Sequence, residues 1–133
     1  MTDLVFFYGT LLAPLHGTRR LHVDDYLVSV GRGHIAGVLF DVGIYPAAVP
    51  ASDASVWGEV YQMTHPAIVT QALDEYEGYR ADDPDGSLYT RAVTPVTLGD
   101  GRVVEAWTYF YNAPLGQAAR IPSGDYLEHL RIR

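Results

Sequence analysis

The sequence contains no cysteine and no lysine, since all nine residues counted as Lys or Arg are arginines. Without cysteine, disulfide bonds, thiolate metal sites and cysteine nucleophiles are excluded. Without lysine, Schiff-base chemistry on a lysine amine is excluded as well. No run approaches the roughly 18 apolar residues of a membrane-spanning helix, so we expect no membrane partner.

Basic charge is scarce compared with acidic charge. The formal net charge is −7 and the isoelectric point is near 5.0. An acidic surface repels phosphate backbones, so nucleic acid is not an expected partner. The first residues, Met1–Asp3, lack a basic leader followed by a hydrophobic stretch. We therefore expect no signal peptide and a cytoplasmic location.

The length and apolar content are those of one globular unit. The chain has 133 residues, of which 48% are hydrophobic. Domains most often have about 100–150 residues, so residues 1–133 are expected to form a single domain. The apolar fraction suffices for one core and excludes a disordered chain.

Short apolar runs separated by turn residues predict a sheet of short strands. The run Leu4–Tyr8 is continuously apolar and is followed by Gly9, which predicts a strand buried on both faces. A hairpin is predicted around Gly99-Asp100-Gly101, which separates two β-rich runs. The other predicted strands cover residues 26–30, 35–40, 56–61, 89–98 and 102–111.

One helix is predicted between Thr64 and Gly78. Thr64 is the expected N-cap, Pro66 suits the first turn, and Gly78 suits the left-handed position that ends a helix. A small helix or turn is expected after Ser123. These elements together predict an α+β domain built on a compact mixed sheet or barrel.

The predicted helix is amphipathic, with an acid in an unexpected place. Two adjacent rows run along one side of the helix: Ile68, Ala72 and Tyr76 form the first, and Val69, Leu73 and Glu77 form the second. The opposite, polar face carries Thr70, Gln71, Asp74 and Glu75. Glu77 continues an apolar row and should therefore face the core or a cleft. The pattern alone leaves two interpretations open. Glu77 either reaches water or an arginine from the last turn, or it is a partly buried acid with a function.

Physical chemistry gives the second interpretation a mechanism. Partial burial disfavours a carboxylate and raises its pKa. The negative end of the helix dipole acts in the same direction. Both effects would bring Glu77 towards the range in which a carboxyl group can accept and return a proton near neutral pH. Glu75 faces solvent and gains much less from burial.

The turn after the first strand is a second candidate site. Gly9 allows the backbone to turn sharply and to approach a ligand closely. Consecutive backbone N–H groups in such a turn can bind an anion without any basic side chain. The alternative is an ordinary turn in which Gly9 only relieves strain.

Several short motifs occur in order along nearly the whole chain. They are Phe7-Tyr8-Gly9-Thr10-Leu11, Val56-Trp57-Gly58-Glu59-Val60-Tyr61, Leu73-Asp74-Glu75-Tyr76-Glu77-Gly78-Tyr79, Tyr89-Thr90-Arg91, Trp107-Thr108-Tyr109-Phe110-Tyr111 and Ser123-Gly124-Asp125-Tyr126. Each motif is weak alone, but the ordered set is fairly specific. It resembles the gamma-glutamylcyclotransferase-like superfamily, with its Tyr-Gly-Thr-Leu signature and its Leu-Asp-x-x-Glu-Gly segment.

The resemblance implies a fold, an activity and a set of site residues. The fold is a small mixed or antiparallel β-barrel with a few packed helices. The activity is that of an acyltransferase or lyase that releases 5-oxoproline and a free amine from a small γ-glutamyl substrate, with no cofactor and no metal ion. The residues carried over are Glu77 as catalytic acid/base and Tyr8, Gly9, Thr10 and Leu11 for substrate binding.

Two questions stay open at this stage. The same fold would also suit a non-catalytic domain that binds a small carboxylate or a protein partner. The acidic loop at residues 80–88 is either a solvated loop or a selector for a cationic amine.

Overall fold

The computed structural model describes residues 2–12, 17–43 and 45–131. Its strands form one sheet in the order β3-β1-β5-β4-β2-β6, and β2 also pairs with β3, which closes a barrel. The pairing of β1 with β5 is parallel and the others are antiparallel, so the barrel is mixed as predicted. The strands are β1 (Leu4–Phe7), β2 (Leu27–Asp41), β3 (Pro46–Met63), β4 (Tyr89–Leu98), β5 (Val103–Tyr111) and β6 (Ala119–Arg120).

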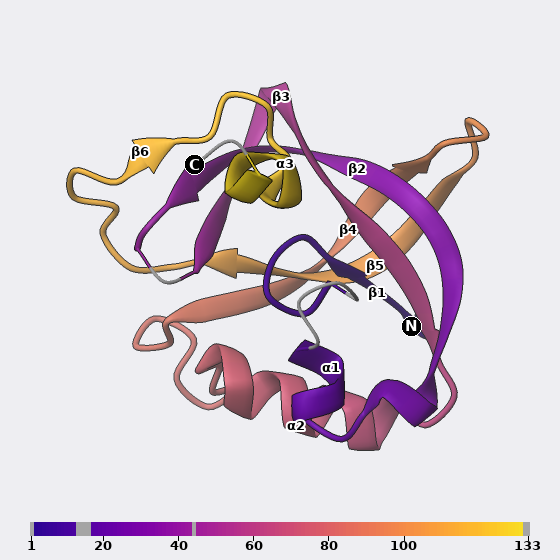
Figure 1. Cartoon of the computed structure of the whole chain (residues 1–133). Helices are drawn as coiled ribbons and strands as arrows, with labels where there is room; N and C mark the ends of the chain where they lie inside the picture. The colour runs from indigo at the N-terminus through magenta and orange to yellow at the C-terminus, as the bar shows by residue number, and fades with distance from the viewer. Residues whose placement is uncertain (1, 13–16, 44, 132–133) are drawn as a thin grey trace.

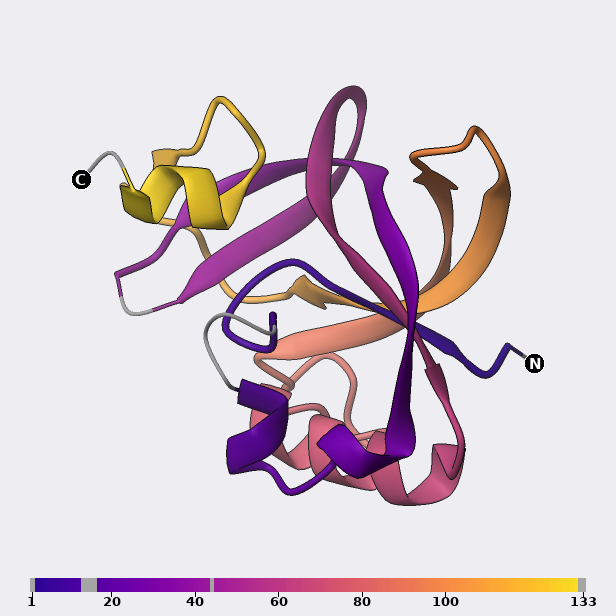
Figure 2. The same cartoon turned by 45° about the vertical axis from the view of Figure 1, so that its right-hand side comes forward.

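Helices cover two sides of the barrel, which makes the fold α+β. They are α1 (Gly17–Arg20), the 3₁₀ turn η2 (Asp24–Tyr26), α2 (Pro66–Glu77) and α3 (Tyr126–Arg131). Both views place α1 and α2 on one side and α3 on the opposite side (Figures 1 and 2). Within the described part of the chain, every helix falls short of the length and apolar character that a membrane span needs.

Two clusters of buried residues share strand β1 between them. Phe6 belongs to the cluster inside the barrel, to which all five barrel strands contribute. Val5 and Phe7 belong to the second cluster, with Val69 and Leu73 of α2. Because neighbouring side chains of a strand point to opposite faces, one strand supplies both clusters. The predicted burial of this strand on both faces is confirmed.

Helix α2 ends as predicted but begins one residue later than expected. Gly78 adopts φ 67° and ψ 36°, and its N–H bonds to carbonyls of the last turn. The N-cap is His65 rather than Thr64, and no side chain caps the helix. Pro66 lies in the first turn, where a backbone N–H would have no hydrogen-bond partner within the helix, so its missing N–H costs nothing.

The predicted faces of α2 are partly wrong. Val69 and Leu73 are buried, but Ile68 and Tyr76 are 48% and 46% exposed. Asp74, expected on the solvent face, has a side chain only 22% exposed. The helix therefore buries a narrower apolar row than the pattern predicted, and its flank at Asp74 contacts the barrel.

The strands β2 and β3 are longer than predicted. Residues 26–30 and 35–40 were expected as two strands, but β2 continues through both, with a shift of register between Ser29 and Gly31. Gly31 thus lies at a β-bulge within one continuous, twisted strand and not in a turn between two strands. The strand predicted from Val56 begins at Pro46, whereas the hairpin at Gly99-Asp100-Gly101 forms as predicted.

Candidate active site

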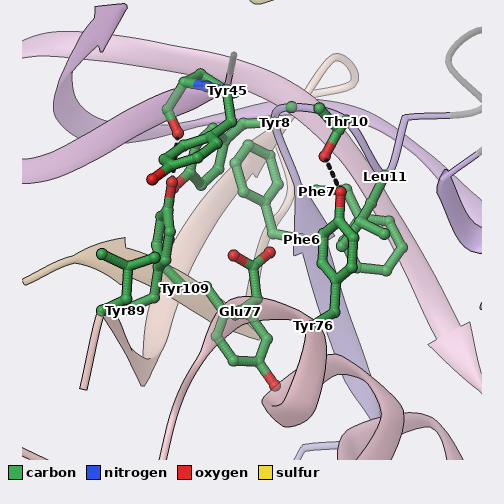
Figure 3. A pocket seen from close by; sticks show the side chains of 13 residues that line it. Phe6, Phe7, Tyr8, Thr10, Leu11, Tyr45, Tyr76, Glu77, Tyr89 and Tyr109 are labelled. Carbon is green, nitrogen blue, oxygen red and sulfur yellow. Dashed lines mark hydrogen bonds between the residues drawn. The ribbon is translucent and has the colours of Figure 1, made fainter. Parts of the chain in front are cut away.

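A pocket of about 210 Å³ lies where the barrel meets α2 and the turn that follows β1. A water molecule takes about 30 Å³ in the liquid, so this space suits a small ligand. Figure 3 shows side chains from these separate segments converging on it. The lining residues are Phe6, Phe7, Tyr8, Gly9, Thr10, Leu11, Tyr45, Pro46, Tyr76, Glu77, Leu88, Tyr89 and Tyr109.

The turn after β1 forms one wall, and Gly9 fits there because it has no side chain. A Cβ on Gly9 would lie 2.5 Å from Cγ of Pro46, much closer than two such atoms can come. The carbonyl of Gly9 accepts a hydrogen bond from the N–H of Leu12 at 2.9 Å. The N–H groups of Thr10 and Leu11 have no hydrogen-bond partner in the described part of the chain. The turn therefore retains donors that a bound group could use.

Glu77 extends from the last turn of α2 into this pocket. Its carboxylate lies between the rings of Phe6 and Tyr109 (Figure 3). Among the described residues, no donor or cation pairs with it. Burial raises its pKa from an ordinary value of 4.5 to about 8. The carboxyl group is thus poised to exchange a proton near neutral pH.

Tyrosines form much of the remaining wall, and their hydroxyls are already engaged. Tyr8 donates a hydrogen bond to the carbonyl of Tyr109 at 2.6 Å and accepts one from the N–H of Ala48 at 3.3 Å. Tyr89 donates to the carbonyl of Pro46 at 2.8 Å. Burial raises the pKa of both tyrosines far above the ordinary value, so both keep their protons. Tyr8 and Tyr89 shape the pocket and do not exchange protons near neutral pH.

A hydrogen bond joins the two parts of the site. The hydroxyls of Thr10 and Tyr76 lie 2.6 Å apart, so the turn after β1 is bonded to the residue before Glu77 (Figure 3). All five residues predicted for the site, Tyr8, Gly9, Thr10, Leu11 and Glu77, line this one pocket.

Several lining residues were absent from the prediction. Tyr45 and Pro46 lie just before and at the start of β3, and Leu88 belongs to the loop at 80–88. The acids of that loop do not line the pocket; Asp82 pairs with Arg80 at the surface and Asp83 accepts from the N–H of Gly86. Tyr89, the first residue of β4, is buried and lines the pocket, although it was not among the predicted site residues. In the described ranges, no group of three or more His, Asp or Glu could hold a metal ion.

This chain is similar to known proteins over most of its length. Residues 5–128 match the family model described as gamma-glutamyl cyclotransferase, AIG2-like. A protein of Methanocaldococcus jannaschii, provisionally named a gamma-glutamylcyclotransferase, is 27% identical over 128 residues, which cover 96% of this chain and 98% of the relative. The gamma-glutamylcyclotransferase family protein YtfP of Escherichia coli is 32% identical over 90 residues, which cover 68% of this chain and 67% of YtfP.

Solved structures show the same fold. The solution structure of YtfP superposes with a TM-score of 0.65 at 28% identity, covering 95% of this chain and 97% of YtfP. The crystal structure of YkqA from Bacillus subtilis superposes with a TM-score of 0.72 at 25% identity and covers 99% of this chain. This chain spans only 42% of YkqA. With the family model matching nearly its whole length, the chain belongs to the gamma-glutamyl cyclotransferase, AIG2-like family.

Proposed function

We propose that the protein is a γ-glutamyl cyclotransferase that converts a γ-glutamyl amine or γ-glutamyl amino acid into 5-oxoproline and the free amine. The observation that carries the proposal is the unpaired Glu77 carboxyl in the pocket, whose pKa burial raises to about 8. The family membership supports the same reaction class. The activity and the Glu77 role go together, because the reaction requires one group that takes and returns protons.

The reaction is an intramolecular aminolysis. The Glu77 carboxylate takes a proton from the α-ammonium of the substrate, and the freed amine attacks the γ-carbonyl carbon to close a five-membered ring. Glu77 then gives its proton to the leaving nitrogen. A second proton follows the same route as the C–N bond breaks. Two protons thus pass from the attacking to the leaving nitrogen, and Glu77 returns to its initial state.

The pKa of Glu77 suits this transfer. A carboxyl with a pKa of about 8 is a stronger base than an ordinary glutamate, yet it can still donate its proton to an amine nitrogen. In the complex, the positive charge of the α-ammonium would favour the carboxylate form. General acid–base catalysis of this type contributes roughly 10²–10⁴-fold to the rate.

The turn after β1 has the complementary role. In the proposal, the N–H groups of Thr10 and Leu11 bind the α-carboxylate of the substrate or the oxyanion formed at the γ-carbon. The walls around Gly9 and Tyr8 hold the glutamyl chain in its curled form. Because nucleophile and carbonyl belong to one molecule, correct orientation can contribute up to about 7–11 kcal/mol in the best cases.

The test is release of 5-oxoproline from a panel of γ-glutamyl amines and γ-glutamyl amino acids. We expect turnover of at least one compound, and a loss of roughly 10²–10⁴-fold in Glu77→Gln. Glu75→Gln, an exposed change on the same helix, is the matched control and should retain activity. Absence of release from every compound at high protein concentration would instead favour a non-catalytic carboxylate-binding domain.

A further inference from the structure

A network of polar side chains lies behind the pocket, beside the turn that carries Glu77. The Oδ1 atom of Asp74 accepts hydrogen bonds from the Tyr109 hydroxyl at 2.5 Å and from Nε of Arg91 at 2.9 Å. The side chains of Asp74 and Arg91 are only 22% and 21% exposed. A carboxylate with an arginine and a tyrosine as donors forms strong, charge-assisted bonds. The reaction proposed above uses none of these three residues.

The guanidinium of Arg91 is held in place by aromatic rings as well. Its central carbon lies 4.6 Å from the centre of the Trp107 ring and 5.3 Å from that of Tyr79. Such cation–π contacts add to the attraction of the ion pair. Asp74 and Tyr79 stand on either side of Glu77 in the sequence, so one arginine of β4 contacts the chain both before and after it.

Tyr109 links this network to the pocket. Its ring lines the pocket next to the Glu77 carboxylate, and its hydroxyl points away towards α2 (Figure 3). Its carbonyl accepts the hydrogen bond of Tyr8 from the other side of the site. Burial, and then the bond to Asp74, raise the pKa of Tyr109, so its hydroxyl remains a donor.

Besides this network, the last turn of α2 is held by the Thr10–Tyr76 hydrogen bond and by backbone bonds of Gly78 and Tyr79, but by few buried side chains. The buried anchors Val69 and Leu73 lie earlier in the helix, while Tyr76 is largely exposed. Helix ends with few buried contacts open locally at a small free-energy cost. An opened turn would carry the Glu77 carboxylate into water.

We propose that Asp74, Arg91 and Tyr109 form a positioning network that fixes the last turn of α2 against the barrel and so holds Glu77 inside the pocket. Asp74 and Arg91 lie outside the pocket lining and the Tyr109 hydroxyl bonds to Asp74, so these polar groups act through Glu77. The catalytic consequence rests on the proposed function. The positional consequence does not, because it concerns only where Glu77 lies.

The test uses two near-isosteric changes, Asp74→Asn and Tyr109→Phe, in the whole chain. The first weakens both bonds by removing a charge, and the second removes one hydroxyl. The matched control is Arg80→Ala, which breaks an exposed ion pair with Asp82 just beyond α2. The titration of the Glu77 side-chain carboxyl carbon, followed by NMR, reports its position without any substrate.

We expect both network variants to lower the titration midpoint of Glu77 by at least about one pH unit, because water reaches the carboxylate. Among the described residues, the other titratable groups that line the pocket around Glu77 are the tyrosines Tyr8, Tyr45, Tyr76, Tyr89 and Tyr109. The Arg80→Ala midpoint should match the wild type. If a cyclotransferase substrate is found, kcat should fall about 10- to 100-fold in both network variants with a smaller change in KM.

Arg91→Lys supplies a graded test, since lysine keeps the charge but lacks the planar group that stacks between two rings. The titration midpoint of Glu77 in Arg91→Lys should lie between those of the wild type and of Asp74→Asn. If Asp74→Asn does not fold, the Glu77 titration midpoint in Tyr109→Phe alone tests the network proposal. An unchanged Glu77 midpoint in the folded variants overturns the network proposal even when wild type is active. A wild type that releases no 5-oxoproline but shows the shifted midpoints refutes the proposed function and leaves the network in place.

Discussion

The substitution Glu77→Gln should make the protein more stable, and increasingly so as pH rises. In the folded protein burial raises the pKa of the Glu77 carboxyl to about 8, whereas the unfolded chain has the ordinary value of 4.5. Below pH 4.5 both states keep the proton. Between pH 4.5 and 8 only the folded state keeps it, so the free energy of unfolding of the wild type falls with rising pH.

The size of the effect follows from the same two values. Each pH unit in this window removes about 1.4 kcal/mol from the free energy of unfolding. The full shift from 4.5 to about 8 corresponds to roughly 5 kcal/mol. Glutamine has no proton to lose, so the stability difference between Glu77→Gln and wild type should grow by this amount from pH 4 to pH 9 and then level off.

The assay is urea denaturation of both proteins across that pH range, followed by the fluorescence of Trp57 and Trp107. Subtracting the two curves removes the contributions of other titrating groups. Glu75→Gln, on the exposed face of the same helix, should give a difference that stays flat with pH. A flat difference for Glu77→Gln as well would refute the placement of Glu77 in a buried pocket, whatever its activity.

Three further substitutions test two walls of the pocket and the end of α2. Gly9→Ala forces a Cβ to within 2.5 Å of Pro46, so the turn must move; we expect at least a tenfold loss of 5-oxoproline release with an unchanged circular dichroism spectrum, and full activity would contradict this. Gly78→Ala places a side chain at φ 67°, which should lower the free energy of unfolding by about 1–2 kcal/mol in urea denaturation. Tyr76→Phe removes the hydroxyl that bonds Thr10, which should lower kcat/KM by roughly two- to tenfold; kinetics identical to wild type would show that the bond is immaterial.

The sequence predicted the local features that depend on a single residue type. Gly78 ends its helix as expected because only a left-handed conformation fits there, and Gly99-Asp100-Gly101 turns a hairpin for the same kind of reason. The helix period put Glu77 in line with Val69 and Leu73, but it left open whether the carboxyl reaches water or a cleft. Its neighbours Val69 and Leu73 are buried as that period requires.

Features that depend on tertiary contacts could not be predicted. The sequence near Gly31 reads as a turn, but pairing with β3 on one side and β4 on the other keeps β2 continuous. Asp74 reads as a solvent residue, yet Arg91 and Tyr109 reach it from strands far along the chain. No local pattern reports such partners, because the barrel that brings them together forms only through distant pairings.

The pocket is assembled from pieces that the chain keeps far apart, from Phe6 near the start to Tyr109 near the end. The complete lining exists only when β1, α2, β4 and β5 are brought together by the fold. A molecule that binds this pocket therefore stabilises the folded chain by RT ln(1 + L/Kd), where L is the free ligand concentration, so the melting temperature rises with both ligand concentration and affinity. Thermal melting in the presence of candidate metabolites can thus identify what the pocket accepts before any reaction has been observed.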